Sequence, residues 1–463
     1  MKIFSPRGPL VPWSLLAATF LLGTAQTQTI ETEPRLLATL PDGVTLDFPP
    51  VRMGSQTYER GRVIRWSPKG DRVAYIGLLD GEEHPFIGDE TLGAYDFIEG
   101  PYFAERTAEC LFRVGNQVGK QKERWWLLLD GDEVFEEDWI GSPSISEDGE
   151  LIALWSQPGA RVEDSGAYNR GPQILNLLCK KGRSYRAQES RRWADATSLQ
   201  KPALADGQCL AVGKPDEASP YTVMGLKAGK KKQLTLDELP GMAERLVVDA
   251  SGDHWGATVS ISKYEQGQFS SERRVVIDGN PIDSEAEEAF GPFFSERDDR
   301  IAICTRLGNT YGVELVGETV DPAYEYAHSP TFGADNRLAF IAAEDARVDP
   351  TFGIGRPDLA LQGGQRFVVL RDRQGLDHPE DLRWDEIRAL RFSPDGTRLA
   401  YAARRGNDWH VVVDGQASDA YDDVGEPRFT EDSQAVAFGA RTDREFWWRV
   451  WDPADADADA GQE

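Results

Sequence analysis

Histidine and carboxylate side chains are the groups in this chain that could carry out metal or acid–base chemistry. The five histidines are His84, His254, His328, His378 and His410. They lie far apart, and none has a partner at the H-x-H or H-E-x-x-H spacing of a metal site. A fold that gathers distant segments around one axis could still unite them, and we would examine His254 and His328 first because both lie beside recurring turns. The alternative is that all five are surface or turn histidines.

Adjacent acids such as Glu136/Glu137 and Asp422/Asp423 are candidates for glycoside hydrolysis, which needs two carboxyl groups about 5–10 Å apart across a cleft. With 78 acidic residues, however, such pairs arise by chance. No G-x-S-x-G, P-loop or helix-opening G-x-G-x-x-G is present. The sequence therefore assigns no catalytic residue, no metal ligand and no cofactor, and it leaves the binding residues unknown.

Some of the 13 tryptophans could contact a ligand. Two predicted strands hold five of them: Trp125, Trp126, Trp447, Trp448 and Trp451. Alternation along a strand points neighbouring side chains to opposite faces. An exposed tryptophan can stack on a sugar or anchor a protein partner, and the alternative is packing in the core.

These residues must be positioned by a repeated element, which is clearest at residues 390–415, LRFSPDGTRLAYAARRGNDWHVVVDG. It contains three apolar runs, and a Pro-Asp-Gly turn separates the first two. Degenerate copies align at Ser67, Ala104, Ser146, Leu204, Ala250, Ser295, Gly333, Ser393 and Thr430. The period is about 40–45 residues with several short strands each, which is typical of a β-propeller blade.

We therefore predict an all-β fold, a single β-propeller of four-stranded blades, seven to nine in number with eight or nine favoured. The last unit, from residue 427, supplies only three strands, so a strand near residues 36–40 is expected to add the fourth and close the ring. Leu399 and Tyr401 fall on one face of their strand and Ala400 and Ala402 on the other, a pattern suited to packing between stacked blades.

Two further signals recur between units. Third strands end in Asp-Gly at Asp130, Asp278 and Asp414, a dipeptide that accepts the positive φ of a tight hairpin. A ten-residue phrase also leads into several units, as AYDFIEGPYF at 94–103, AYEYAHSPTF at 323–332 and AYDDVGEPRF at 420–429. Both signals support a repeat built from strands and turns.

Three long inserts interrupt the repeats, at residues 159–172, 182–198 and 345–364. They are polar and are interpreted as loops on a rim, where function tends to concentrate, although neutral decoration is the alternative. Cys110, Cys209 and Cys304 lie among apolar neighbours and are expected to be buried free thiols, with one disulfide left open in an oxidising compartment.

Residues 1–25 have the pattern of a secretory signal peptide. Lys2 and Arg7 precede an apolar stretch that ends in Gly23-Thr24-Ala25, a small-residue cleavage site. We expect a signal peptide at 1–25, a segment with the ring-closing strand at 26–60, the propeller at 61–452 and a disordered acidic tail at 453–463. The expected location is extracytoplasmic, either periplasmic or secreted, with no membrane span after cleavage. An uncleaved N-terminal anchor is the alternative.

The net charge of −27, from 51 basic and 78 acidic residues, argues against nucleic acid as a partner, because nucleic acid is bound by lysine and arginine patches. It does not identify a partner.

The units resemble the WD40-like repeats of TolB-type β-propellers. The resemblance lies in the phrase P-x-F-S-P-D-G-x-x-L-A-Y, best at residues 391–401 and 66–75, and in the V-V-V-D-G that follows. It covers nearly all of residues 61–451 and implies an extracytoplasmic propeller used mainly for protein interactions. Residues 1–60 do not contain the α/β domain that precedes the propeller in TolB itself, so a role in that protein's envelope complex is not expected.

We therefore expect a non-enzymatic scaffold that binds a protein or peptide. The alternative is a propeller-type polysaccharide lyase or hydrolase with a composite site at the mouth of the channel, so polysaccharide stays open as a ligand. The side chains that line the central channel should discriminate between the two.

Overall fold

The computed structural model describes residues 30–49, 51–53, 56–58, 63–162, 171–182, 184–196, 201–216, 218–230, 232–265, 268–318, 323–348 and 361–454. The predicted signal peptide and residues 455–463 of the predicted tail lie outside these ranges. The segment boundaries inferred from the sequence stay a prediction.

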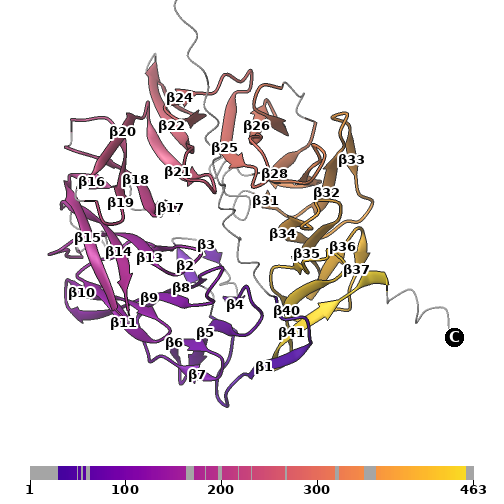
Figure 1. The fold of residues 1–463 in the computed structure, drawn as a ribbon, viewed down its shortest axis with the longest axis horizontal. Helices are drawn as coiled ribbons and strands as arrows, with labels where there is room; N and C mark the ends of the chain where they lie inside the picture. The colour runs from indigo at the N-terminus through magenta and orange to yellow at the C-terminus, as the bar shows by residue number, and fades with distance from the viewer. Residues whose placement is uncertain are drawn as a thin grey trace, which may run out of the picture.

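Nine antiparallel sheets in the described part of the chain stand side by side around a central axis, as Figure 1 shows. The predicted all-β β-propeller is confirmed, and it has nine blades. In most blades the first strand of the unit lies toward the axis, and the strands that follow it in the chain are hydrogen-bonded in order outward. The described residues give the sixth blade three strands, and two short ribbons stand apart from the blades.

The strands follow the chain in order around the ring. Blades one to three comprise β4 (Ile64–Trp66), β5 (Val73–Leu79), β6 (Glu82–Ile87), β7 (Glu90–Thr91), β8 (Phe97–Phe103), β9 (Cys110–Gly119), β10 (Lys122–Leu129), β11 (Asp132–Glu137), β12 (Ser144–Ile145), β13 (Leu151–Ser156), β14 (Gln173–Lys181) and β15 (Ser184–Trp193). Blades four to six comprise β16 (Asp195–Ala196), β17 (Ala203–Ala205), β18 (Gln208–Lys214), β19 (Thr222–Lys227), β20 (Leu234–Glu238), β21 (Met242–Val248), β22 (Trp255–Glu265), β23 (Gln268–Ile277), β24 (Asn280–Pro281), β25 (Glu288–Phe294), β26 (Ile301–Leu307) and β27 (Thr310–Leu315).

Blades seven to nine complete the circle. They comprise β28 (Tyr326–Phe332), β29 (Leu338–Glu344), β32 (Gln365–Arg371), β33 (Asp377–Pro379), β34 (Glu386–Phe392), β35 (Leu399–Arg405), β36 (Asp408–Val413), β37 (Gln416–Ala417), β38 (Asp423–Val424), β39 (Arg428–Phe429), β40 (Val436–Thr442), β41 (Glu445–Trp451) and β1 (Arg35–Thr39). The two ribbons are β2 (Val51–Met53) with β3 (Gln56–Tyr58), and β30 (Arg347–Val348) with β31 (Leu361–Gln362).

The ring is closed by strands from opposite ends of the sequence. β1 pairs antiparallel with β41, from Arg35 opposite Trp448 to Thr39 opposite Glu445, and so supplies the outer strand of the ninth blade. The predicted closure by an N-terminal strand is thereby confirmed. Ala38 is buried in a cluster with Phe446 and residues of the first blade, so the strand also joins the core.

Both faces of a blade are apolar because each packs on a neighbouring blade. Leu399 and Tyr401 of β35 contact the seventh-blade cluster that includes Ile341. Ala400 and Ala402 of the same strand pack with the ninth blade. Large and small side chains on opposite faces thus let successive sheets approach closely, as the alternation predicts.

The Ser-Pro-Asp-Gly stretch is a turn, as predicted. The backbone N–H of Ser393 donates to the carbonyl of Arg398 at 3.0 Å, and that of Gly396 donates to the carbonyl of Ser393 at 2.7 Å. Asp395 accepts from the Ser393 hydroxyl at 2.6 Å. The sequence alignment places Ala250 at the position equivalent to Ser393 in the fifth blade. The structure shifts this position by one residue to Asp249, because the N–H of Asp249 donates to the carbonyl of His254 as that of Ser393 donates to Arg398.

The Asp-Gly dipeptides are tight turns with positive φ at both residues, 49° at Asp414 and 81° at Gly415. The carboxylate of Asp414 also accepts from the backbone N–H of Leu399 at 2.9 Å and from the Arg398 side chain at 2.8 Å. Asp130 and Asp278 likewise accept the N–H that begins the second strand of their own blade, from Cys110 and Trp255.

A long polar side chain at the start of the second strand connects several blades to the next turn. Arg398 donates to the carbonyl of Gln434 at 2.5 Å, and Arg337 donates to that of Gly396 at 2.8 Å. The same contact is made from Arg72 to Ala108, from Gln208 to Gly252 and from Arg300 to Gly333. These hydrogen bonds fix the turns of adjacent blades against one another.

One of the predicted rim loops is a strand instead. Residues 184–193 form β15, which pairs with β14 along the outer edge of the third blade. An outermost strand faces solvent, so it tolerates the polar composition that suggested a loop. The insert at 345–364 begins and ends as the β30–β31 ribbon, while residues 163–170 and 349–360 lie outside the described ranges.

The four cysteines are free thiols in the structure. Cys110, Cys209 and Cys304 are buried in the second strands of their blades, as predicted, and burial raises the pKa of each thiol. Cys179 in β14 is half-buried. None of the three buried thiols is placed for reaction with a solute.

We predict that Gly396→Ala lowers the free energy of unfolding by about 3 kcal/mol, because φ is +72° and an added Cβ would lie 2.3 Å from the Ala334 backbone nitrogen. Gly406→Ala is the matched control, since Gly406 also has positive φ (+62°) but nothing lies within 4 Å. It should lose only about 1 kcal/mol. Denaturant titration measures both, and equal losses would contradict the inter-blade contact.

We predict that Ala38→Glu weakens ring closure by about 2 kcal/mol or more, because it buries a carboxylate between β41 and the first blade. Thr39→Glu should be nearly neutral, since Thr39 is exposed on the other face of the strand. Thermal melts of both variants test this. Similar melting temperatures would show that β1 contributes little to stability.

Candidate functional site: the central channel

The inner strands that line the axis are bent by bulges. Register shifts fall between Glu99 and Tyr102 in β8, Phe290 and Phe293 in β25, His328 and Thr331 in β28, and Arg388 and Arg391 in β34. A bulge leaves residues outside the ladder and redirects their side chains. In β8 and β28 the bulge lies within the recurring ten-residue phrase, which therefore helps to shape the channel wall.

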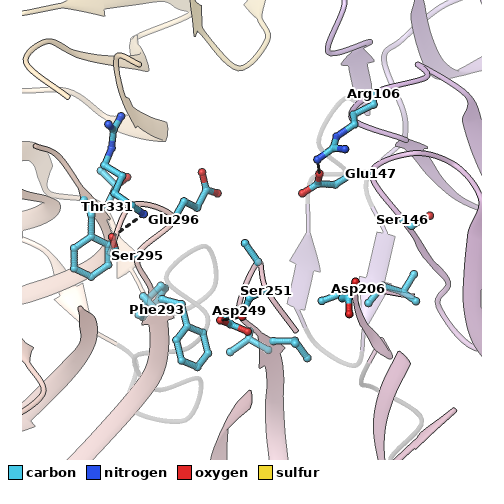
Figure 2. Close-up of a pocket in the computed structure, with 18 of the residues that line it drawn as sticks. Arg106, Ser146, Glu147, Asp206, Asp249, Ser251, Phe293, Ser295, Glu296 and Thr331 are labelled. Carbon is cyan, nitrogen blue, oxygen red and sulfur yellow. Dashed lines mark hydrogen bonds and ion pairs between the residues drawn. The ribbon is translucent and has the colours of Figure 1, made fainter. Parts of the chain in front are cut away.

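A cavity of about 1260 Å³ occupies the channel at the face that carries the Ser-Pro-Asp-Gly turns. Figure 2 shows Arg106 and Glu147 on one side of the opening, Ser295 and Glu296 on the other, and Asp249 between them. These residues come from the second, third, fifth and sixth blades of the ring. The wall is thus composite, as a propeller axis allows.

Guanidinium and phenyl groups form part of this wall. The Arg245 guanidinium lies 4.4 Å from the centre of the Phe293 ring and 5.4 Å from that of Phe290, and burial lowers its pKa. Arg297 extends across the seventh blade and donates to the carbonyls of Ser393 and Pro394. The mouth therefore combines cations, aromatic rings and exposed turn backbone.

The acids at the mouth are held by the turns. Partial burial opposes ionisation of Asp249, but hydrogen bonds from Ser251 at 2.6 Å and from the His254 backbone outweigh it and lower the pKa of Asp249. Asp148 is lowered in pKa in the same way by the Ser146 hydroxyl. Arg106 pairs with Glu147 at 2.9 Å. These carboxylates are therefore already engaged by groups of the protein itself.

A second cavity of about 490 Å³ lies along the channel beside the first to fourth, eighth and ninth blades. Its wall includes Arg65, Lys201, Arg388 and Arg428. Ile145 and Arg428 contribute to both cavities, so the two are adjacent. Sequence reasoning missed these basic residues, because each lies in a different unit and no two form a motif.

The structure does not bring the histidines together in the channel wall. His254 is exposed, and its Nδ1 donates to the carboxylate of Asp278 at 2.7 Å, which raises the pKa of His254. His328 is buried in β28 beside the ring of Tyr326. His378 contacts Asp372, and His84 and His410 lie in third strands of other blades. Within the described ranges, no three His, Cys, Asp or Glu side chains are grouped so that they could hold a metal ion.

The adjacent acids singled out from the sequence are held by ion pairs or by backbone hydrogen bonds, and Glu137 accepts from the N–H of Asp138 at 2.9 Å. Glu136 pairs with Arg124 at 2.5 Å on the outer strand β11. Asp423 is buried and pairs with Arg388 at 2.5 Å, while Asp422 accepts from the N–H of Asp443. Each carboxylate therefore has a structural role.

The tryptophans alternate as expected. Trp125 and Trp448 are buried, and Trp126, Trp447 and Trp451 are half-buried. Trp125 stacks on Phe97 with ring centres 5.3 Å apart and carries the Arg113 guanidinium at 3.9 Å. These contacts are packing within and between blades.

Comparison with known proteins finds only distant structural likenesses. No family model matches the chain, and no curated protein matches it. Among solved structures, one from a structural and mechanistic analysis of two prolyl endopeptidases has a TM-score of 0.42 and 12% sequence identity, and the match covers 87% of this chain and 55% of that chain. An oligogalacturonate lyase in complex with manganese gives 0.39 at 11%, covering 74% and 97%. TolB from Acinetobacter baumannii gives 0.30 at 10%, covering 73% and 80%.

The described residues contain no helix of the length and apolar character that crossing a bilayer requires.

We predict that acid selectively weakens the turn at Asp395. Hydrogen bonds, first from Ser393 and then from Thr397, lower the pKa of Asp395 to about 2. An unfolded aspartate has a pKa of about 3.9, so the stabilisation is present above pH 4 and is lost as the pH falls toward 2. The melting temperature of wild type should exceed that of Asp395→Asn at pH 5, and the difference should shrink by pH 2. A constant difference would contradict this.

Proposed function

We propose that this protein is an extracytoplasmic β-propeller that binds a segment of another protein or a peptide in its central channel and acts as a scaffold rather than an enzyme. The observation that carries the proposal is the cavity at the turn face, about 1260 Å³ in volume and lined by arginine and phenylalanine side chains from several blades. This volume exceeds the range of about 300–1,000 Å³ typical of small-molecule pockets. It suits a length of polypeptide.

The chemistry of the wall supports the same proposal. Arginine and aromatic side chains contribute most of the binding energy in protein interfaces. Arg245 is held in place by the rings of Phe290 and Phe293, so little conformational entropy is lost when a partner binds. A scaffold of this kind presents a fixed surface on rigid inner strands.

Two of the acids at the mouth do not match the general acid of a polysaccharide hydrolase. Asp148 and Asp249 have lowered pKa values and accept hydrogen bonds within their turns. A general acid in glycoside hydrolysis needs a raised pKa. The extracytoplasmic location is supported by the signal-like pattern of residues 1–25.

Panning a displayed random peptide library on the full mature chain tests the proposal. We predict enrichment of peptides that bind wild type and bind Phe293→Ala at least about tenfold more weakly, because the variant removes an aromatic wall and the support of Arg245. Tyr264→Ala is the matched control, as this exposed aromatic lies outside the residues that line either cavity.

Two results would contradict the proposal. One is the absence of any peptide that discriminates wild type from Phe293→Ala. The other is the release of new reducing ends or unsaturated sugars from a panel of polysaccharides, which would establish the enzymatic alternative.

A further inference from the structure

The second cavity has the opposite charge balance from the molecule. The whole chain carries a formal charge of −27. The wall of the 490 Å³ cavity nevertheless contains four cations and only two acids, Glu105 and Glu426. By contrast, acids and cations are nearly balanced around the larger cavity. A local excess of positive charge in an acidic protein requires a physical explanation, because like charges at close range destabilise the fold.

Two of the four cations are not neutralised by an acid in the described part of the chain. The Lys201 ammonium lies 3.7 Å from the centre of the Tyr102 ring, and no ion pair to it is formed there. Arg65 is exposed in the lumen and donates to the carbonyl of Ile64 at 3.0 Å. The other two are paired, Arg388 with Asp423 and Arg428 with Glu105.

The half-buried carboxylate of Glu99, whose charge acts on Lys201, is already occupied. Glu99 pairs with Arg113 at 2.5 Å and also accepts from the Tyr102 hydroxyl. The protein surrounding Lys201 lowers the pKa of its ammonium; Glu99 opposes that effect and the positive charge of Arg65 adds to it. Arg65 and Lys201 thus stand close enough to repel each other, and an anion between them would relieve that repulsion.

We infer that this part of the channel binds the carboxylate side chains of an acidic peptide segment, with Arg65 and Lys201 as the specificity-determining cations. The inference rests on the proposed function, because it names the class of segment that the channel accepts. Cations in a confined, partly desolvated lumen interact with carboxylates more strongly than they would on an open surface.

The aromatic side chains favour a peptide over an acidic polysaccharide. Sugar binding uses open aromatic faces, but the face of Tyr102 is covered by Lys201. Trp448 is only 1% exposed, and Trp66 packs against Gly425 and Gly439 of the ninth blade. The rings of Tyr102, Trp448 and Trp66 are thus engaged by the protein itself, whereas the charges of Arg65 and Lys201 face the lumen and can bind carboxylates.

Fluorescence anisotropy with labelled (Glu-Ala)₄ tests the inference, using the full mature chain. We expect this peptide to bind, the neutral (Gln-Ala)₄ to bind at least about tenfold more weakly, and the affinity for (Glu-Ala)₄ to fall as salt rises. Lys201→Glu and Arg65→Glu should each reduce that affinity by about tenfold or more. Lys201→Gln and Arg65→Gln remove the positive charge without reversing it, so each should reduce the affinity for (Glu-Ala)₄ less than the glutamate variant does. This graded loss distinguishes a charge effect from a misfolded variant.

Lys214→Glu is the matched control. Its ammonium also lies over a tyrosine ring, 4.6 Å from the centre of Tyr221, yet it lines neither cavity. It should bind (Glu-Ala)₄ as wild type does. Arg391→Glu, in the wall of the larger cavity, should have a smaller effect than Arg65→Glu.

Several results would overturn the inference. They are no preference for (Glu-Ala)₄ over (Gln-Ala)₄, an equal loss in Lys214→Glu, or binding of an oligouronate of equal charge in place of the peptide. Library peptides that depend on Phe293 but lack acidic residues would refute this inference and leave the proposed function standing. Failure to recover any such peptide would refute the proposed function itself.

Discussion

A blade with two apolar faces is stable only between two other blades, and this requirement determines the rest of the structure. Leu399 and Tyr401 need the seventh blade, and Ala400 and Ala402 need the ninth. A linear stack would leave an apolar face at each end, whereas a ring leaves none. The pairing of β1 with β41 supplies this closure, and the central channel is its geometric result.

Contacts between turns complement the packing of the blades. Arg337 and Arg398 each reach a carbonyl in the next turn, and Asp414 orients Arg398 from within its own blade. The glycine at the centre of the turn admits this approach, since Gly396 lies directly against Ala334. The turn face is therefore a rigid rim around the larger cavity, and side chains on it hold fixed positions.

The fold could be predicted from the sequence because the same pattern of strands and turns recurs in each unit, so an ambiguous copy is identified by the clearer ones. Turn residues such as Asp395, Gly396 and Asp414 mark the strands, and alternation identifies the buried faces. The strand β15 was missed because an outer strand is polar like a loop. The channel could not be predicted in the same way. Arg65 and Lys201 come from different units, and only the closed ring brings them to one wall.

The arrangement of the closing strands has a mechanical consequence. β1 and β41 are antiparallel, and Arg35 lies opposite Trp448, so the chain leaves both strands at the same end of their ladder. Tension applied through these ends would load the hydrogen bonds one after another, as when a zipper is opened, rather than all together in shear. The packing of Ala38 against Phe446 stabilises the closure, but it does not change the order in which a pulling force would break these hydrogen bonds. If a partner pulled on both ends of the chain, the ninth blade would be the first part of the ring to open.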